Sequence, residues 1–431
     1  MYNDLFDFIA ASPSPFHAVA ETALRLRQAG YRQLEETEHW QLDAAGRYFA
    51  IRGGTSLIAW QMPTEAGAGW RMAAAHSDSP AFKVKSASQR AGCTMLDTEA
   101  YGGMLRATWM DRPLGLAGRV VVRTAQGVEG RLIAPKADLA VMPSLAIHMD
   151  RAANDGHKYD LQKDTQALFG LSGTESYTSL LAKEANCAPE DILGADVQLY
   201  CRQPGTLTGP EGELTLCPRL DDLACAWAAL TGFLAADGKG RGQGAVFCLF
   251  DSEEVGSGTA QGACGSFLPD VLARAGEALG ESRDARRRAL ANSLLLSADN
   301  GHAIHPNHAE MSDPSHPVRL GGGVVLKFNA SQKYTTTGLT AGLFHCLCEK
   351  AGVPVQEYYN RPDLPGGSTL GNLLSAQVSV PMLDIGLPQL AMHSCVETAA
   401  TADLTHLAAV CESWYKAFIA PTGGGSYEVR L

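Results

Sequence analysis

Short apolar runs that end abruptly in polar residues recur along the chain. Three of them are Trp70–Ala75 before His76, Ala245–Phe250 before Asp251, and Asn292–Ser297 before Ala298 and Asp299. Their length and apolar content predict strands buried on both faces of an α/β sheet. Because ligands bind outside the carboxyl ends of such strands, the polar residues after each run are candidates for a functional site.

Helical patterns lie between these runs. The segment from Pro15 to Gly30 has a Ser-Pro start and a glycine end, and further helices are expected at about 264–279, 338–350 and 402–420. The segment from Asp221-Asp222 to Leu234 is apolar on all sides, which indicates a buried helix. An acidic pair is favoured at a helix N-terminus, so capping alone would explain one of these two aspartates.

The pattern changes between about Phe82 and Cys217. Alternating positions, as in Leu116–Arg123, predict strands and hairpins, and turn-rich and helical pieces follow. A chain of this length is expected to form two domains. We predict an α/β catalytic domain made of residues 1–81 and 218–431, and an inserted β-rich domain, residues 82–217, that serves dimerisation or acts as a lid.

Composition disfavours several functional classes. The chain has 431 residues and a formal net charge of -11, and its densest basic segment, Arg283–Arg288, fits a solvated helical face. Binding to nucleic acid is therefore not expected. No apolar run approaches the ~20 residues that cross a bilayer, and the N-terminus lacks a signal-peptide pattern, so we expect a cytoplasmic protein. The 11 cysteines are scattered and fit small buried hydrophobes in a reducing compartment.

Five predicted strand or helix ends each supply a carboxylate or a histidine. Each has a simple structural explanation alone; the glutamate pair, for example, would be a solvated acidic turn. Five separate explanations are disfavoured in combination. The residues are His76, Asp221, Glu253 with Glu254, Asp299 and His393. They supply the ligands of a co-catalytic di-metal site with one bridging carboxylate and one free glutamate, for which zinc is the expected metal and manganese or cobalt are alternatives.

The motifs around these residues identify a family. They are His76-Ser-Asp78, Arg219-Leu-Asp-Asp222, Asp251-Ser-Glu-Glu-Val-Gly-Ser257, Ser297–Asn307 and Leu390-Ala-Met-His-Ser394. Three further motifs lie in the predicted insertion: Tyr101-Gly-Gly103, Thr108–Arg112 and Pro143–His148. In this order, from about residue 10 to 415, the set resembles the aspartyl aminopeptidase family of di-zinc metallopeptidases.

The resemblance implies a mixed-sheet α/β catalytic domain interrupted by a β-rich domain, and a homo-oligomer in the form of a tetrahedral dodecamer. It implies that His76 and Asp299 bind one zinc ion. Glu254 and His393 would bind the other, and Asp221 would bridge the two.

The resemblance also implies the chemistry. Glu253 would be the general base, Asp78 the hydrogen-bond partner of His76, and the Asp221–Asp222 peptide bond would be cis. In this scheme a hydroxide that bridges the two zinc ions attacks the first peptide bond of a substrate, and Glu253 passes a proton to the departing amine. The expected substrates are peptides with an acidic N-terminal residue, Asp more than Glu.

Selectivity for an acidic residue requires a cation in the pocket. Lys327, inside an apolar strand-like segment, is the candidate, although a lysine there could also reach the surface. The resemblance favours Lys327 as well, together with His302, Tyr334 and His148, the last from a neighbouring subunit. The alternative is a related di-metal aminopeptidase of broader or glutamyl specificity. A catalytically dead scaffold would require a lost ligand or base, and none is lost.

The chain departs from the usual family pattern at three places. Gly366-Gly367 replaces a Cys-Gly, Ser331-Gln-Lys-Tyr334 replaces Asn-Gln-Arg-Tyr, and Glu310–Pro314 lacks a common Lys-His. The ligand set is unchanged. These departures therefore concern the pocket and the subunit contacts.

Overall fold

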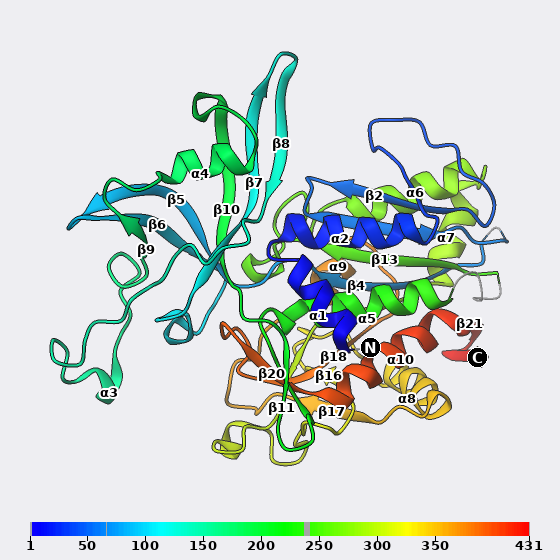
Figure 1. The fold of residues 1–431 in the computed structure, drawn as a ribbon. Coiled ribbons are helices and arrows are strands. Elements are labelled where there is room, and N and C mark those ends of the chain that lie inside the picture. The colour runs from blue at the N-terminus through cyan, green and yellow to red at the C-terminus, as the bar shows by residue number, and fades with distance from the viewer. Residues whose placement is uncertain (1, 66, 237–241, 431) are drawn as a thin grey trace.

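The computed structural model describes residues 2–65, 67–236 and 242–430. Within these residues the largest sheet is mixed and nine-stranded (Figure 1). In spatial order its strands are β1 (Arg32–Gln33), β2 (Arg47–Arg52), β3 (Ser56–Gln61), β13 (Gly244–Phe250), β4 (Trp70–His76), β14 (Leu294–Ala298), β18 (Met382–Gly386), β16 (Val324–Phe328) and β17 (Val355–Tyr359).

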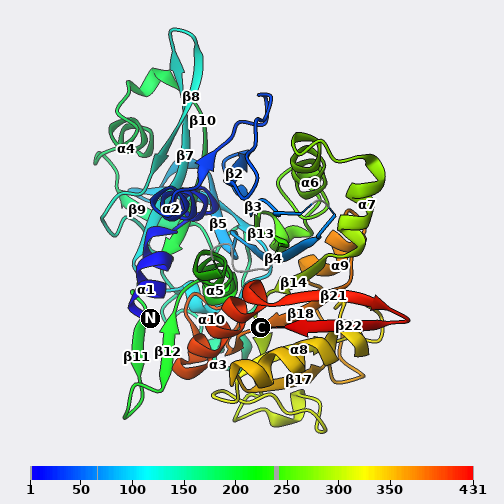
Figure 2. The same cartoon turned by 90° about the vertical axis from the view of Figure 1, so that its right-hand side faces the viewer.

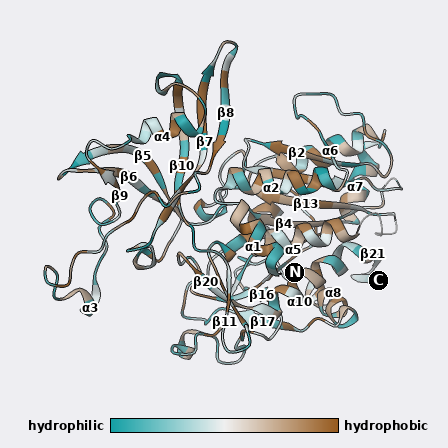
Figure 3. Ribbon diagram, in the orientation of Figure 1, coloured by the Kyte–Doolittle hydropathy of each residue, from teal (hydrophilic) through white to brown (hydrophobic). Residues whose placement is uncertain are grey.

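The centre of this sheet is parallel. β13, β4, β14 and β18 run in the same direction, whereas β3 and β16 flank them in antiparallel pairing. Side chains of β13 alternate between two separate hydrophobic clusters: Phe247 and Leu249 join one, and Val246 and Cys248 join the other. The predicted strands buried on both faces are therefore confirmed, and hydrophobic colouring follows them in Figure 3.

Helices cover both faces of the sheet (Figure 2). On one face lie α1 (Tyr2–Ala11), α2 (Pro15–Gln28), α5 (Leu220–Ala236), α8 (Gly338–Ala351) and α10 (Thr401–Lys416). On the other lie α6 (Phe267–Ala278), α7 (Arg283–Ala291) and α9 (Leu370–Ser375). No helix among the described residues is long and apolar enough to cross a membrane. All 11 cysteines are free, as the sequence predicted.

The helix predicted at 402–420 is wrong at its C-terminal end. α10 stops at Lys416, and the chain continues as a hairpin of β21 (Phe418–Gly423) and β22 (Ser426–Arg430). The carbonyl of Ile419 accepts hydrogen bonds from the buried side chains of Arg71 and Gln243. Hydrogen bonds from residues distant in sequence therefore hold Ile419 in the hairpin, although the local sequence pattern predicted that it would be helical.

A second sheet of six strands has its own hydrophobic cluster and lies beside the α/β part (Figure 1). Its order is β8 (Gly127–Ile133), β7 (Leu114–Thr124), β10 (Ile192–Cys201), β5 (Ala81–Arg90), β6 (Cys93–Tyr101) and β9 (Ala167–Leu171). The connections contain the short helices α3 (Ala153–Gly156) and α4 (Tyr177–Glu184), and the 3-10 turns η1 (Arg106–Trp109) and η2 (Pro189–Asp191).

A third sheet joins segments from both halves of the sequence. Its order is β11 (Thr206–Thr208), β12 (Leu214–Cys217), β20 (Glu397–Ala400), β19 (Pro388–Leu390) and β15 (Gly301–His302). Residues 206–217 were assigned to the insertion by their sequence pattern, but β12 pairs with β20, and β11 pairs with β12, so that both strands belong to this third sheet and not to the six-stranded one. The division into two domains, with boundaries at 82 and 217, stays a prediction.

Candidate active site

The candidate site lies at the carboxyl edge of the parallel strands. Phe250, the last residue of β13, pairs with His76, the last residue of β4. On the other side of β4, Ser297 of β14 pairs with Ala74, so Asp299 follows directly beside His76. The three apolar runs that the sequence showed to end in polar residues therefore end side by side.

Two groups of ligand atoms lie at this edge, and within each group all the atoms are within 4.8 Å of one another. One group contains His76, Asp221, Asp222 and Asp299, and the other contains Asp221, Glu254 and His393. Asp221 belongs to both, as a carboxylate shared by two ions would. Asp222 was not among the predicted ligands, and one of its oxygens already accepts the N–H of His76 at 3.1 Å.

Several carboxylate oxygens of these groups are buried without a hydrogen-bond partner among the described residues. They are Asp221 Oδ1, Asp222 Oδ1 and Glu254 Oε1. A buried carboxylate oxygen without a hydrogen bond is unfavourable, even where a histidine nitrogen lies 3.4 Å away, as it does for Asp221 and Glu254. Burial together with the charge of Asp221 raises the pKa of Glu254. Divalent cations would supply the missing partners, and the mixture of imidazole and carboxylate groups suits zinc.

Asp221 is held by backbone contacts at the start of α5. Asp221 and Asp222 have non-helical backbone angles, and the peptide bond between them is cis, as the resemblance implies. The N–H of Asp221 donates to Glu397 at 3.0 Å, and its carbonyl accepts from Ser79 at 2.7 Å. Its carboxylate faces Nε2 of His76 at 3.4 Å and Nε2 of His393 at 3.5 Å, instead of capping the helix.

His393 is fixed through the same glutamate. Its N–H donates to Glu397 at 2.8 Å, and its Nε2 lies 3.4 Å from Glu254 Oε1. Glu397 is buried at the start of β20, and burial raises its pKa to about 8. We assigned Glu397 no role from the sequence. It lies four residues after His393, but nothing local indicates that its carboxylate accepts two backbone N–H groups of the site.

The Glu253-Glu254 turn separates its two glutamates. It is a 3-10 turn, η3 (Glu253–Val255), between left-handed residues Ser252 (φ 65°) and Gly256 (φ 92°). Glu254 belongs to the second ligand group, whereas Glu253 belongs to neither group and lines the adjacent cavity. Burial raises the pKa of Glu253 to about 8, although His76 opposes this shift. A carboxylate with such a pKa can exchange protons near neutral pH.

Asp78 contacts His76, the partner predicted for it, and three further groups. Nδ1 of His76 lies 2.9 Å from the main-chain carbonyl of Asp78 and 3.4 Å from its carboxylate. That carboxylate accepts the N–H groups of Glu253 and Glu254 at 3.2 and 3.1 Å, and the hydroxyl of Tyr101 at 2.7 Å. Asp78 thus supports the turn as well as the histidine.

A cavity of about 330 Å³ opens onto both ligand groups. Its walls also include Glu253, Asn300, His302, Lys327, Tyr334 and Tyr358. Lys327 is buried; its Nζ donates to the carbonyl of Asn300 at 2.7 Å and lies 3.7 Å from Asp299 Oδ1. His148 does not line this cavity and is exposed in a loop of the predicted insertion.

Two of the departures from the family pattern meet beside the cavity. Nζ of Lys333 donates to the carbonyl of Gly366 at 2.9 Å, and Gly367 lines the cavity wall. The segment 331–334 and the Gly366-Gly367 loop therefore lie in contact on one side of the pocket.

Comparison with known proteins decides the family. The family model for aminopeptidase I zinc metalloproteases (M18) matches residues 8–418. The chain belongs to the M18 family of zinc aminopeptidases. It is 41% identical over 424 residues to a probable M18 family aminopeptidase 2 of Pseudomonas aeruginosa, covering 95% of this chain and 97% of that protein.

Solved structures extend the likeness to the M18 fold. In the structure of the Ape4 and Nbr1 complex, the matching chain has a TM-score of 0.92 and 33% identity, covering 96% of this chain and 85% of that chain. The S. cerevisiae mApe1 dodecamer gives a TM-score of 0.82 and 25% identity, covering 96% of each chain. The mixed α/β fold and the metallo-aminopeptidase activity that the motifs predicted are those of this family.

Proposed function

We propose that this M18 aminopeptidase binds two zinc ions and removes N-terminal acidic residues from peptides, Asp in preference to Glu. Two observations carry the proposal: Asp221 belongs to both ligand groups, and the cavity that opens onto them contains a buried lysine. Two ions would need the shared carboxylate, and an acidic side chain would need the enclosed cation.

The residues present can hold both ions. His76 and Asp299 would bind one ion, Glu254 and His393 would bind the other, and Asp221 would bind both. Manganese or cobalt could replace zinc at such ligands. When bound, the ions lower the pKa of a coordinated water and polarise the scissile carbonyl.

Glu253 would move the proton. It lies outside both ligand groups, so its carboxylate stays free to accept the proton of the attacking water and to deliver it to the departing amine. Asp78 would hold the turn through the two backbone N–H groups that it accepts. His302 and Tyr334 line the cavity near Lys327 and would complete the pocket for the substrate side chain.

Substituting Lys327 tests the acidic preference. We expect Lys327→Met to lower kcat/KM for an N-terminal Asp substrate at least 100-fold, but for an N-terminal Ala substrate less than about tenfold, because only the former loses its counter-charge. Lys350→Met is the matched control, since Lys350 is exposed, donates to the carbonyl of Val429 and is not part of the cavity wall. The measurement is kcat/KM on Asp-, Glu-, Ala-, Leu- and Lys-amides after reloading with zinc, manganese or cobalt.

Broader specificity is the second candidate, and one observation favours it. Nζ of Lys327 already donates to Asn300 and lies 3.7 Å from Asp299, so part of its charge is neutralised before a substrate binds. Equal losses on the Asp and Ala substrates in Lys327→Met would support this alternative and exclude the acidic pocket.

We also infer that the chain forms a homo-oligomer, with the dodecamer of mApe1 as the guide. His148 is exposed between Ile147 and Met149, whose side chains are 47% and 76% exposed, so this loop offers apolar surface to a neighbouring copy and could bring His148 to its pocket. Sedimentation of the purified chain as a monomer would contradict this inference. The cytoplasmic location stays a prediction.

A further inference from the structure

The end of β6 contacts the carboxylate that supports the Glu253-Glu254 turn. The hydroxyl of Tyr101, the last residue of β6, donates to Asp78 Oδ2 at 2.7 Å. The same carboxylate accepts the N–H groups of Glu253 and Glu254. Asp78 is fully buried, so its three donors supply the hydrogen bonds that water would otherwise provide. The six-stranded sheet thus supplies one of the three donors that orient the support of the turn.

Gly102, the next residue, packs against the turn itself. Its backbone is left-handed (φ 74°), and a Cβ atom built there would lie 3.1 Å from Cβ of Glu254 and 3.5 Å from its Oε2. The position tolerates little beyond hydrogen. A side chain at Gly102 would press on a residue of the second ligand group.

The Tyr101 ring is itself fixed within the six-stranded sheet. Nζ of Lys83 on β5 lies 4.6 Å from the ring centroid and donates to Gln198 on β10 at 3.1 Å. Lys83 is partly buried and its pKa is lowered by burial, against the opposing charges of Asp251 and Asp78. A cation over the ring face and a hydrogen bond from the hydroxyl together leave the phenol one orientation.

We propose that Tyr101 and Gly102 are positioning residues for the Glu253-Glu254 turn, so that the six-stranded sheet sets the geometry of the active site. The inference rests on the proposed function, which assigns Glu253 and Glu254 their roles. Hydrogen bonds to an ionised carboxylate are about twice as strong as neutral ones. Without the phenol, Asp78 would be free to reorient, and both glutamates would lose their common support.

Tyr101→Phe tests the hydrogen bond. We expect kcat to fall about tenfold, with KM, metal content and Tm close to those of the wild type, because the ring and its packing remain. Tyr177→Phe is the matched control: the Tyr177 side chain is buried in the cluster of the six-stranded sheet, and its hydroxyl has no hydrogen-bond partner among the described residues. That substitution should leave kcat unchanged.

Gly102→Ala tests the close approach with a readout other than activity. Its control is Gly92→Ala, which also has a left-handed backbone (φ 79°) but no atom within 4 Å of the added Cβ. Both substitutions carry the same backbone strain. Only Gly102→Ala should displace Glu254, so it should lose zinc several times faster during dialysis against a mild chelator, as followed by metal analysis.

The outcomes separate the two proposals. If Tyr101→Phe and Gly102→Ala both behave like their controls, the positioning role is overturned while wild-type turnover still upholds the aminopeptidase. If the wild type hydrolyses no N-terminal residue, the proposed function fails, and zinc retention in the two glycine variants still decides the positioning role. If Tyr101→Phe does not fold, the glycine pair alone decides it.

Discussion

Glu253 and Glu254 show how environment gives neighbouring residues of one type different properties. The backbone N–H groups of both glutamates donate to Asp78, and left-handed residues lie on either side of the turn. The two side chains nevertheless have different neighbours. Glu254 lies 3.4 Å from His393, whereas Glu253 remains outside both ligand groups. One carboxylate can bind metal while the other handles protons.

The proposed roles of the two glutamates predict the effect of removing the charge of Glu253. We expect Glu253→Gln to retain both metals and to lower kcat at least 1000-fold, because the amide cannot accept the proton of the attacking water. Glu349→Gln, an exposed position in α8, serves as the control. Metal analysis and turnover are measured on the same sample. Near-normal turnover in the metal-replete variant would exclude Glu253 as the base.

At the same scale, local sequence could predict ligands but not their supports. His76 is the last residue of a buried strand and Asp299 directly follows another, so their positions after apolar runs mark both as candidates. Glu397 on β20 accepts the N–H of Asp221, 176 residues away in sequence, and Tyr101 on β6 donates to Asp78, 23 residues away. Carboxylates and phenol hydroxyls are also common on protein surfaces, so the sequence does not show that these two belong to the site.

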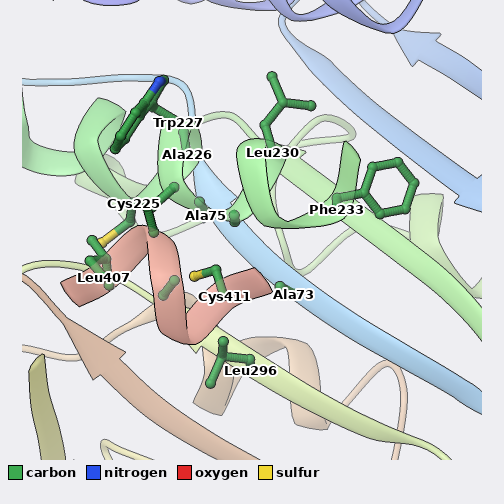
Figure 4. Packing of buried hydrophobic residues seen from close by; sticks show 14 of the residues in the cluster. Ala73, Ala75, Cys225, Ala226, Trp227, Leu230, Phe233, Leu296, Leu407 and Cys411 are labelled. Atoms are coloured by element: carbon green, nitrogen blue, oxygen red, sulfur yellow. The ribbon is translucent and has the colours of Figure 1, made fainter. Parts of the chain in front are cut away.

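α5 and α10 form the tightest helix contact at the scale of elements. Leu230 and Phe233 of α5, Leu407 and Cys411 of α10, and Ala73 and Ala75 of β4 belong to one hydrophobic cluster (Figure 4). Gly232 of α5 lies against the backbone of α10, where an added Cβ would be 2.5 Å from the carbonyl carbon of Cys411. The absence of a side chain lets the two helices approach, which holds the start of α5, and with it Asp221, against the sheet.

Two helical glycines should respond in opposite directions to alanine. Gly232→Ala should lower Tm strongly, because backbone cannot move aside and overpacking costs about 1–3 kcal/mol or more. Gly342→Ala in α8, exposed and with nothing within 4 Å, should raise stability by about 0.5–1 kcal/mol through helix propensity. Thermal unfolding at equal protein concentration is the measurement. Equal shifts in both variants would contradict the close approach.

At the scale of the whole molecule, the carboxylates of the site lie together where segments of the three sheets meet. Asp299 follows β14 of the nine-stranded sheet, and Tyr101 ends a strand of the second sheet. Asp221 lies at the start of α5, just after β12 of the third sheet, and His393 precedes β20 of that sheet. Bound cations would therefore stabilise the junction as well as the chemistry.

Chelation should consequently destabilise the fold. We expect removal of zinc to lower Tm on the order of 5 °C, because the buried carboxylates lose their counter-charge and a ligand of the native state is withdrawn. Zinc should restore Tm in a concentration-dependent manner, and magnesium, which favours oxygen ligands and keeps its waters, should restore less. An unchanged Tm after complete metal removal would mean that the ligand groups do not contribute to stability.

The sequence by itself determined the strands, the candidate ligands and the family. Hydrophobic runs and the residues that follow them are local features of the sequence. Because ligands bind at the carboxyl edge of parallel strands, these features predict both the strands and the site residues. Only the tertiary structure decided the rest: that Asp222 lies within the first ligand group, that Glu397 and Asp78 accept the backbone N–H groups of the site, and that α10 ends at Lys416. These features depend on contacts between segments that are distant in sequence. A local sequence pattern does not show the free energy of such contacts.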